Sequence, residues 1–283
     1  MSTTVESAEP RGSRLGSLTT AGKVRFAVFT LVALAIVAMN LVMTPSYLLA
    51  APVTGWFQDL GVHQVHDMTV GMLVWLAFVV PMALMLYHPR DRVNAVLAPL
   101  VAAVSVAAMA FLAGSFLFEG FAVGSVLALA ALVLHPAGWS LARFDRVESV
   151  DRRVAGLLVV GAVPLLVYAG LELGKQVGPA DEHVAFVHYG GMAVVAFLVA
   201  LMGVLAVFRR RDWRFAAWSA GLMAAFVGLA SVGYPTSESS VGPIAGVLLV
   251  LWAVAFVAGV EYVRRGRTGS ESEPLDETAT GPA

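Results

Sequence analysis

Eight long apolar runs, separated by short polar segments, make up most of the chain. They cover residues 26–49, 63–87, 93–114, 121–142, 154–173, 184–208, 215–234 and 241–263. An α-helix rises about 1.5 Å per residue, so a run of about 20 residues is long enough to cross a hydrocarbon core of about 30 Å. The pattern therefore predicts an all-α, polytopic membrane protein with eight transmembrane helices.

A duplication underlies this pattern. At an offset of 120 residues the same residue types recur at His63/His183, Gly71/Gly191, Met72/Met192, Val74/Val194, Val79/Val199, Met82/Met202 and Arg90/Arg210. A gap of two residues also aligns His66 with His188. Self-similarity at a fixed period indicates repeated structural units. Because each unit holds four helices, an even number, the two repeats are expected to be parallel.

The expected organisation follows from these boundaries. Residues 1–22 are polar and small and are predicted to be a disordered cytoplasmic N-terminus, and residues 268–283 a disordered, acidic cytoplasmic tail. Residues 23–145 form the first four-helix repeat and residues 146–267 the second. The first apolar run is too long for the core of a signal peptide, so it is expected to stay as a membrane helix.

Composition places the chain in a lipid bilayer. Hydrophobic residues make up 59% of it and charged residues only 13%, and the mean hydropathy is +0.81. The net charge of -1 gives no basic surface for nucleic acid. The chain has no cysteine, which excludes disulfides, iron–sulfur clusters and thiolate metal sites.

The basic residues predict the orientation. Short loops rich in lysine and arginine stay in the cytoplasm. With the amino terminus inside, 17 of the 18 basic residues fall on the cytoplasmic side, and Lys175 alone lies outside. The sequence therefore predicts a multi-pass protein of the cell membrane with both termini in the cytoplasm and the lipid bilayer as its main partner.

Polar side chains of the predicted helices collect toward the outer face. They are Asn40, Tyr47, His63, His66, Asp67, Tyr168, Glu172, Asp181, Glu182, His183, His188, Tyr189 and Tyr234. Ionisable groups are costly to bury in lipid, so such groups usually face the interior of a bundle and mark a site. We therefore expect a functional site near the outer ends of the helices.

The histidine spacing differs between the two copies. His63, His66 and Asp67 stand at i, i+3 and i+4, within about 100° of one face of a helix. His183 and His188 differ by about 140°, so both point at one centre only if the helix starts after His183.

Two kinds of ligand fit these side chains. A pair of imidazoles from different membrane helices, His66 and His188, is suited to grip the iron of haem b. Alternatively, a copper or zinc ion is held by His63, His66, Asp67 and His183. A third possibility is that the polar groups only satisfy one another by hydrogen bonds. The methionines are more simply explained as filling of an apolar core than as copper ligands.

The architecture and the segments Gln64-Val65-His66 and Phe186-Val187-His188 resemble haem A synthase. The chain differs from that family in lacking histidines at the outer starts of helices four and eight and in having His63 where the family has its catalytic glutamate. By this resemblance His66 and His188 are axial ligands of one haem held between the halves. It implies a haem-binding redox or electron-transfer protein with a membrane redox partner, and leaves open whether the chain is an enzyme. Eight-helix copper-resistance proteins are the competing resemblance.

Overall fold

The computed structural model describes residues 19–87, 92, 94–136, 150–208 and 212–270, with side chains as far as residue 265. Within these ranges the chain is helical and contains no strand. The all-α fold class predicted from the sequence is confirmed. Most of the predicted N-terminal segment and all but three residues of the predicted C-terminal tail lie outside the described residues.

The elements follow one another as a series of helices. They are α1 (Thr20–Met43), α2 (Ser46–Thr54), η2 (Gly61–His63), α3 (Gln64–Leu73), η3 (Val74–Val79), α4 (Val80–Tyr87), α5 (Leu97–Leu112), α6 (Phe118–Leu134), α7 (Arg152–Gln176), α8 (Glu182–Ala185), α9 (His188–Phe208), α10 (Trp213–Gly233) and α11 (Pro243–Ser270). The segments from η2 to α4 form one continuous helical run, Gly61–Tyr87.

Six of these helical segments in the described chain are long and apolar enough to cross a membrane: Thr20–Met43, Gly61–Tyr87, Arg152–Gln176, His188–Phe208, Trp213–Gly233 and Pro243–Arg265. The protein therefore has the architecture of a multi-pass membrane protein. Two further apolar helices, α5 and α6, are shorter than the predicted runs 93–114 and 121–142. At about 1.5 Å per residue they extend over about 24 to 26 Å.

The first predicted run, 26–49, is wrong after residue 43, because α1 ends at Met43 and a separate helix, α2, follows. Pro45 explains the end of α1, since proline has no N–H and disfavours a helical conformation in the residue before it. The segment after Pro45 is helical as well, and α2 contains Pro52.

The run Gly61–Tyr87 is interrupted by a π-helical turn, η3, just before Pro81. The N–H of Val80 donates to the carbonyl of Trp75, five residues earlier. Proline inside a helix removes one hydrogen bond and crowds the preceding turn, and a wider turn relieves this crowding. The predicted helix 63–87 is otherwise confirmed.

The predicted helix 184–208 is divided in two. The short helix α8 ends at Ala185 and α9 begins at His188. Between them Val187 has φ 61°, in the left-handed region that a β-branched residue rarely adopts. The chain therefore changes direction immediately before His188.

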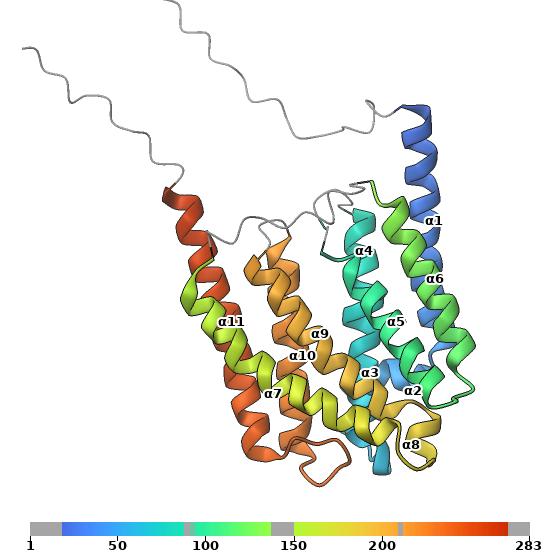
Figure 1. Cartoon of the computed structure of the whole chain (residues 1–283), viewed down its shortest axis with the longest axis vertical. Coiled ribbons are helices and arrows are strands. Elements are labelled where there is room, and N and C mark those ends of the chain that lie inside the picture. Colours follow the sequence, from blue (N-terminus) through green and yellow to red (C-terminus); the bar gives the residue numbers. More distant parts are fainter. Residues whose placement is uncertain (1–18, 88–91, 93, 137–149, 209–211, 271–283) are drawn as a thin grey trace, which may run out of the picture.

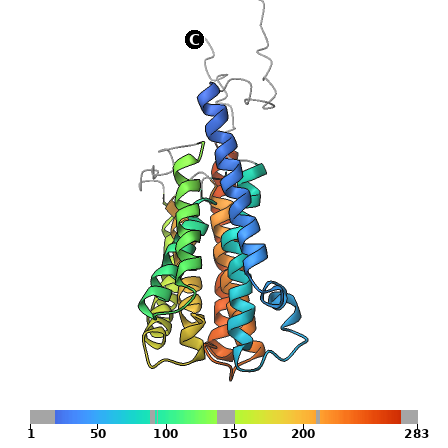
Figure 2. The ribbon, with the colours of Figure 1, turned by 90° about the vertical axis from the view of Figure 1, so that its right-hand side faces the viewer.

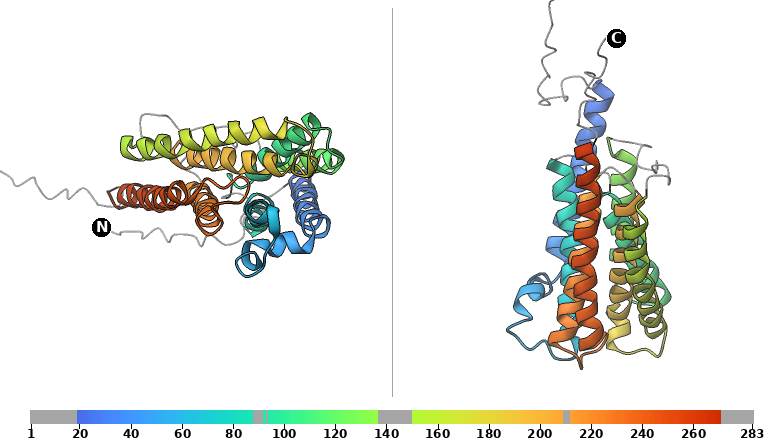
Figure 3. Two further views of the ribbon diagram at one scale, coloured as in Figure 1. Left: turned by 90° about the horizontal axis from the view of Figure 1, so that it is seen from below. Right: turned by 90° about the vertical axis from the view of Figure 1, so that its left-hand side faces the viewer.

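The helices form two layers, seen from one end in Figure 3. One layer holds α7, α9, α5 and α6, and the other holds α11, α10, the α3–α4 run and α1. In an apolar stretch of 18 residues in α9, 78% of the residues are buried, against 17% in the corresponding stretch of α1, so α9 is central and α1 peripheral. The described ends of the chain lie at the same end of the bundle, and α2 and α8 lie at the other (Figures 1 and 2).

The loops that follow the two histidine-bearing runs meet at the end of the bundle opposite α8. Asp212 is buried there, with one carboxylate oxygen 3.1 Å from a guanidinium nitrogen of Arg92 and the other accepting hydrogen bonds from the N–H groups of Asn94 and Ala95. Burial raises the pKa of the Asp212 carboxyl to about 6, against the lowering effect of Arg92. A charge pair between Arg92 and Asp212 therefore joins the two halves of the chain here, at residues separated by 120 positions.

Candidate metal centre

The first half of the chain supplies His63 and His66. His63 ends the 3₁₀ turn η2, and His66 lies in the first turn of α3, where it is fully buried. Gln64 fixes this junction because its side-chain oxygen accepts from the N–H of Leu60 (2.6 Å) and its side-chain nitrogen donates to the carbonyl of Gly55 (2.5 Å). A spacing of three residues places both imidazoles on one side of the run, as the sequence predicts.

The second half supplies His183 and His188, one on each side of the break between α8 and α9. The condition set by the sequence, that a helix must begin after His183 for both rings to share a centre, is met. His183 lies in α8, whose first turn is capped by the side chain of Asp181, and His188 is the first residue of α9.

The four histidines converge. One ring nitrogen from each of His63, His66, His183 and His188 lies within 4.8 Å of the others. The centroids of neighbouring rings are 4.7 to 5.8 Å apart, and His66 and His188 are stacked at 5.3 Å with 25° between their planes. The cluster contains two rings from each half of the chain, as the duplication would place them.

This spacing is close to that of a coordination sphere. Copper or zinc binds imidazole nitrogen at about 2.0–2.1 Å, so nitrogens on opposite sides of one ion are about 4 Å apart and tetrahedral neighbours about 3.4 Å. Side-chain movements of about 1 Å would bring the four nitrogens from the observed spacing to these distances. No rearrangement of the backbone is needed.

Three of the histidines have one ring nitrogen facing an acid, and each of the four has one ring nitrogen without a partner in the described part of the chain. Nε2 of His63 is 3.6 Å from Glu182, Nδ1 of His183 is 3.8 Å from Asp181, and Nε2 of His188 is 3.9 Å from Asp67. The opposite nitrogens, which are Nδ1 of His63, Nδ1 of His66, Nε2 of His183 and Nδ1 of His188, are buried and have no hydrogen-bond partner in the described part of the chain.

Metal-binding histidines commonly have a carboxylate on the side of one ring nitrogen, which leaves the lone pair of the other for the ion. At 3.6 to 3.9 Å the three acids lie beside the rings, beyond hydrogen-bond length.

His66 reaches its acid through a serine. Its Nε2 is 2.7 Å from Oγ of Ser239, in the loop between α10 and α11, and that hydroxyl donates in turn to the buried carboxylate of Glu172 on α7. Since the serine proton goes to Glu172, Oγ accepts from Nε2–H of His66. This fixes the tautomer of His66 and leaves Nδ1 as an acceptor.

The sequence identified part of this set. His63, His66 and His183 were candidate metal ligands, and His66 and His188 were candidate haem ligands; the structure brings all four together. Asp67, also a candidate metal ligand, lies beside His188 instead of in the group of four nitrogens, because it is one residue further round the helix than His66. Ser239 was missed, since a serine in a polar loop carries no signal of its own.

Other candidates lie apart from the cluster. The histidine at position 88 is outside the described residues. His135 is buried near the other end of the bundle, where its ring meets Phe29 edge-on at 5.3 Å, as expected for a structural residue. Met68 and Met192 are fully buried in an apolar cluster with Val65, Phe226 and Ala230, which supports the interpretation that they fill the core.

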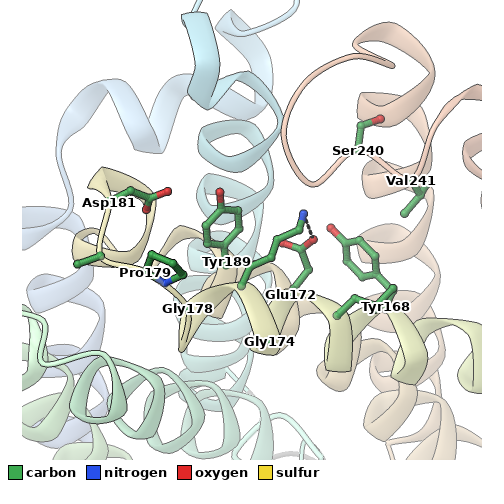
Figure 4. A pocket seen from close by; sticks show the side chains of 12 residues that line it. Tyr168, Glu172, Gly174, Gly178, Pro179, Asp181, Tyr189, Ser240 and Val241 are labelled. Carbon is green, nitrogen blue, oxygen red and sulfur yellow. Dashed lines mark hydrogen bonds and ion pairs between the residues drawn. The ribbon is translucent and has the colours of Figure 1, made fainter.

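A cavity of about 910 Å³ is lined by several residues that contact the histidines, among them Asp181 and Tyr189 (Figure 4). Tyr189 forms part of its wall and stacks on His183 at 5.3 Å with 25° between the rings. Glu172 and Lys175 form another part, with Nζ of Lys175 2.9 Å from Glu172 and over the ring of Tyr189. The cavity therefore lies against the groups that surround the histidines.

No known protein family, curated protein or solved structure matches this chain at the level that would show a relationship. The function must therefore be inferred from the geometry of the site.

Proposed function

We propose that the protein is a multi-pass membrane protein that holds one copper ion between its two halves through His63, His66, His183 and His188. One observation carries the proposal: each of the four histidines offers a ring nitrogen within 4.8 Å of those of the other three, and each has one buried ring nitrogen without a hydrogen-bond partner in the described chain. A single ion would satisfy all four.

The energetics favour a ligand over a purely structural cluster. A buried acceptor left without a partner costs about 1–3 kcal/mol, and native proteins rarely leave such groups unsatisfied. Four of them gathered at one point would make this region the least satisfied polar site in the described chain. Binding of an ion converts that cost into coordination.

The ring packing favours a metal ion over haem. In a bis-histidine haem the two imidazoles approach opposite faces of the porphyrin plane and point their nitrogens at the iron. Here His66 and His188 face each other as stacked rings, and each also contacts the rings of His63 and His183. The haem b predicted from the sequence would require these rings to separate.

The donor set favours copper. The chain offers imidazole nitrogens and no thiolate, and among divalent first-row ions copper(II) binds such donors most tightly. Zinc is the competing ion because it accepts four nitrogens in a tetrahedral arrangement. Acids near each histidine offset the charge of either ion.

The proposed role is to hold copper or to pass electrons to a membrane redox partner. Four protein ligands close the coordination sphere, whereas catalytic metal sites keep one position open for water or substrate. Transporters usually bind their substrate near the middle of the membrane, but these histidines lie at one end of the bundle.

The proposal includes the topology expected from the sequence: eight spans, two parallel four-helix repeats, and both termini in the cytoplasm of a cell-membrane protein. The arrangement of the layers supports the duplication. The helices of the two halves correspond in order: α1 to α7, the α3–α4 run to α9, α5 to α10 and α6 to α11. When each helix is replaced by its counterpart, one layer becomes the other. The α5 and α6 spans are the shortest and need the turns before them to reach across the bilayer.

The test is metal analysis and spectroscopy of the full-length protein, purified in detergent without metal-affinity resin and loaded with copper(II). We expect one copper per chain and a paramagnetic resonance spectrum with hyperfine splitting from four nitrogens. Replacement of His66 or His188 by alanine should abolish the four-nitrogen spectrum. His135→Gln, which removes a buried histidine outside the cluster, should leave it unchanged.

The same sample separates the alternatives. Zinc in place of copper in protein from metal-replete cells would change the ion but keep the site. A Soret band with sharp reduced α and β bands, lost with His66 or His188, would support haem b and contradict the proposal. A folded protein that binds none of these would show that the cluster is structural.

A further inference from the structure

The break between α8 and α9 has a specific support in the fold. The side-chain amide of Gln176, fully buried at the end of α7, bridges it: the nitrogen donates to the carbonyl of Val184 (2.9 Å), and the oxygen accepts from the N–H of Gly190 (2.7 Å). These two backbone groups lie on opposite sides of the break. Gln176 therefore replaces helical hydrogen bonds that the break removes.

The break also has a conformational cost. Val187 is buried and has φ 61°, and a non-glycine residue held there is strained unless its surroundings enforce the conformation. Such strain is found where a function needs it. Here the residue lies between two of the four clustered histidines.

The packing leaves little freedom around this turn. A Cβ added to Gly190 would lie 2.8 Å from Cγ1 of Val187 and 2.9 Å from Cβ of Met109 on α5, so a side chain at position 190 would clash with both. The N–H of Gly191 donates to the carbonyl of Val187 (2.8 Å) and starts the hydrogen bonding of α9. Contacts from α7, α5 and α9 thus fix one path for residues 185–191.

We propose that Gln176 is a positioning residue for the metal centre: it holds the break at Val187 so that His183 and His188 enter one coordination sphere before any ion arrives. The inference rests on the proposed copper site. Without the break, an unbroken helix would direct these two imidazoles about 140° apart, and only one of them could reach the centre. Gln176 acts through the backbone, because its amide bonds to the carbonyl of Val184 and the N–H of Gly190.

The test compares three variants of the full-length protein, metal-free and loaded with copper(II). Gln176→Leu should reduce the number of coupled nitrogens in the resonance spectrum from four to three and weaken copper binding about 10–100-fold, the range seen when groups that orient metal ligands are lost. Val187→Gly should keep four nitrogens, because glycine adopts this φ freely. Asn94→Leu, which removes a buried amide at the other end of the bundle, should lower thermal stability without changing the spectrum.

Gln176→Glu serves where Gln176→Leu does not fold. It keeps an acceptor for the N–H of Gly190 and loses the donor to Val184, so the same loss of a nitrogen is expected in weaker form. A folded Gln176→Leu protein with four coupled nitrogens and unchanged affinity would overturn the inference.

Hydrogen exchange of the metal-free protein separates this inference from the copper proposal. Amides of residues 184–191 should exchange faster in Gln176→Leu than in the unaltered chain, whether or not a metal binds. A wild-type protein that binds no metal would refute the copper site. Unchanged protection in Gln176→Leu would refute the positioning role.

Discussion

The two halves of the chain bring two histidines each to the same centre by different means. In the first half His63 and His66 are three residues apart on one helical run, and local geometry alone places them on one side. In the second half His183 and His188 are five residues apart, and a strained turn at Val187 is needed to bring them together. One pair is aligned by the helix and the other by tertiary contacts.

This difference shows which part of the site is robust. A helix forms its own hydrogen bonds, so the first pair needs only the junction at Gln64 to be set correctly. The second pair depends on a buried amide from another helix and on close packing around the turn. Substitutions elsewhere in the chain should therefore displace His183 and His188 more easily than His63 and His66.

Loss of a ligand from either half should have the largest effect. If all four imidazoles bind one ion, His66→Ala and His183→Ala should each weaken copper binding by more than the roughly 100-fold seen for outer groups, measured by competition with a chelator. The double variant should bind copper only slightly more weakly than the single variant of lower affinity, because loss of either histidine already breaks the same four-ligand coordination sphere. Independent, additive losses would instead indicate two separate sites, one in each half.

The acids around the histidines should have the next largest effect, and it should be unequal. Glu172→Gln interrupts the hydrogen-bonded chain through Ser239 to His66 and should weaken copper binding about 10–100-fold.

Asp67→Asn is the matched comparison, since its oxygen is 3.9 Å from His188, beyond hydrogen-bond length. It should change affinity several-fold at most. If Asp67→Asn weakens copper binding more than Glu172→Gln does, the orientation of His188 depends more on its acid than the orientation of His66 does.

Removing the break should make the two halves alike. Deletion of Phe186 and Val187 leaves the two histidines three residues apart, the spacing of His63 and His66, so an unbroken helix would place both rings on one face. We expect this deletion to restore copper affinity to within about tenfold of the unaltered chain when it is combined with Gln176→Leu. The measurement is the same chelator competition, with Gln176→Leu alone as the reference, and no recovery would mean that spacing does not distinguish the halves.

Much of the fold could be predicted from the sequence because apolar length and helical periodicity are local properties. The six long spans and the helix 63–87 follow from them, whereas the predicted run 26–49 passed over Pro45, which ends α1 at Met43. The break before His188 was stated only as a condition, because no glycine or proline marks Val187.

The candidate site was predicted in its residues but not in its grouping. The repeat indicated His63, His66, His183 and His188 as candidates. Whether they form a haem-binding pair or one metal-binding set could be judged only from the distances between helices. Glu172 was visible as a polar residue in an apolar run. Its link to His66 runs through Ser239, which is 67 residues after Glu172 and 173 residues after His66. No local sequence pattern reveals contacts over such separations.

The smallest expected effect concerns the other end of the bundle, where the two copies carry opposite charges at Arg92 and Asp212. The pKa of Asp212 is about 6 in the folded protein, above its ordinary value of 3.8. Between these values the folded chain keeps a proton that the unfolded chain has lost, so stability should fall as pH rises from about 4 to 6 and level off above.

Asp212→Asn tests this directly, because asparagine tolerates the left-handed φ of 55° at this position and keeps one acceptor oxygen. The melting temperature of the unaltered protein, minus that of the variant, should decrease by a few degrees between pH 4 and 6. A difference that increases over this range would mean that the guanidinium of Arg92 outweighs burial. The carboxylate would then stabilise the link between the two copies in its ionised form.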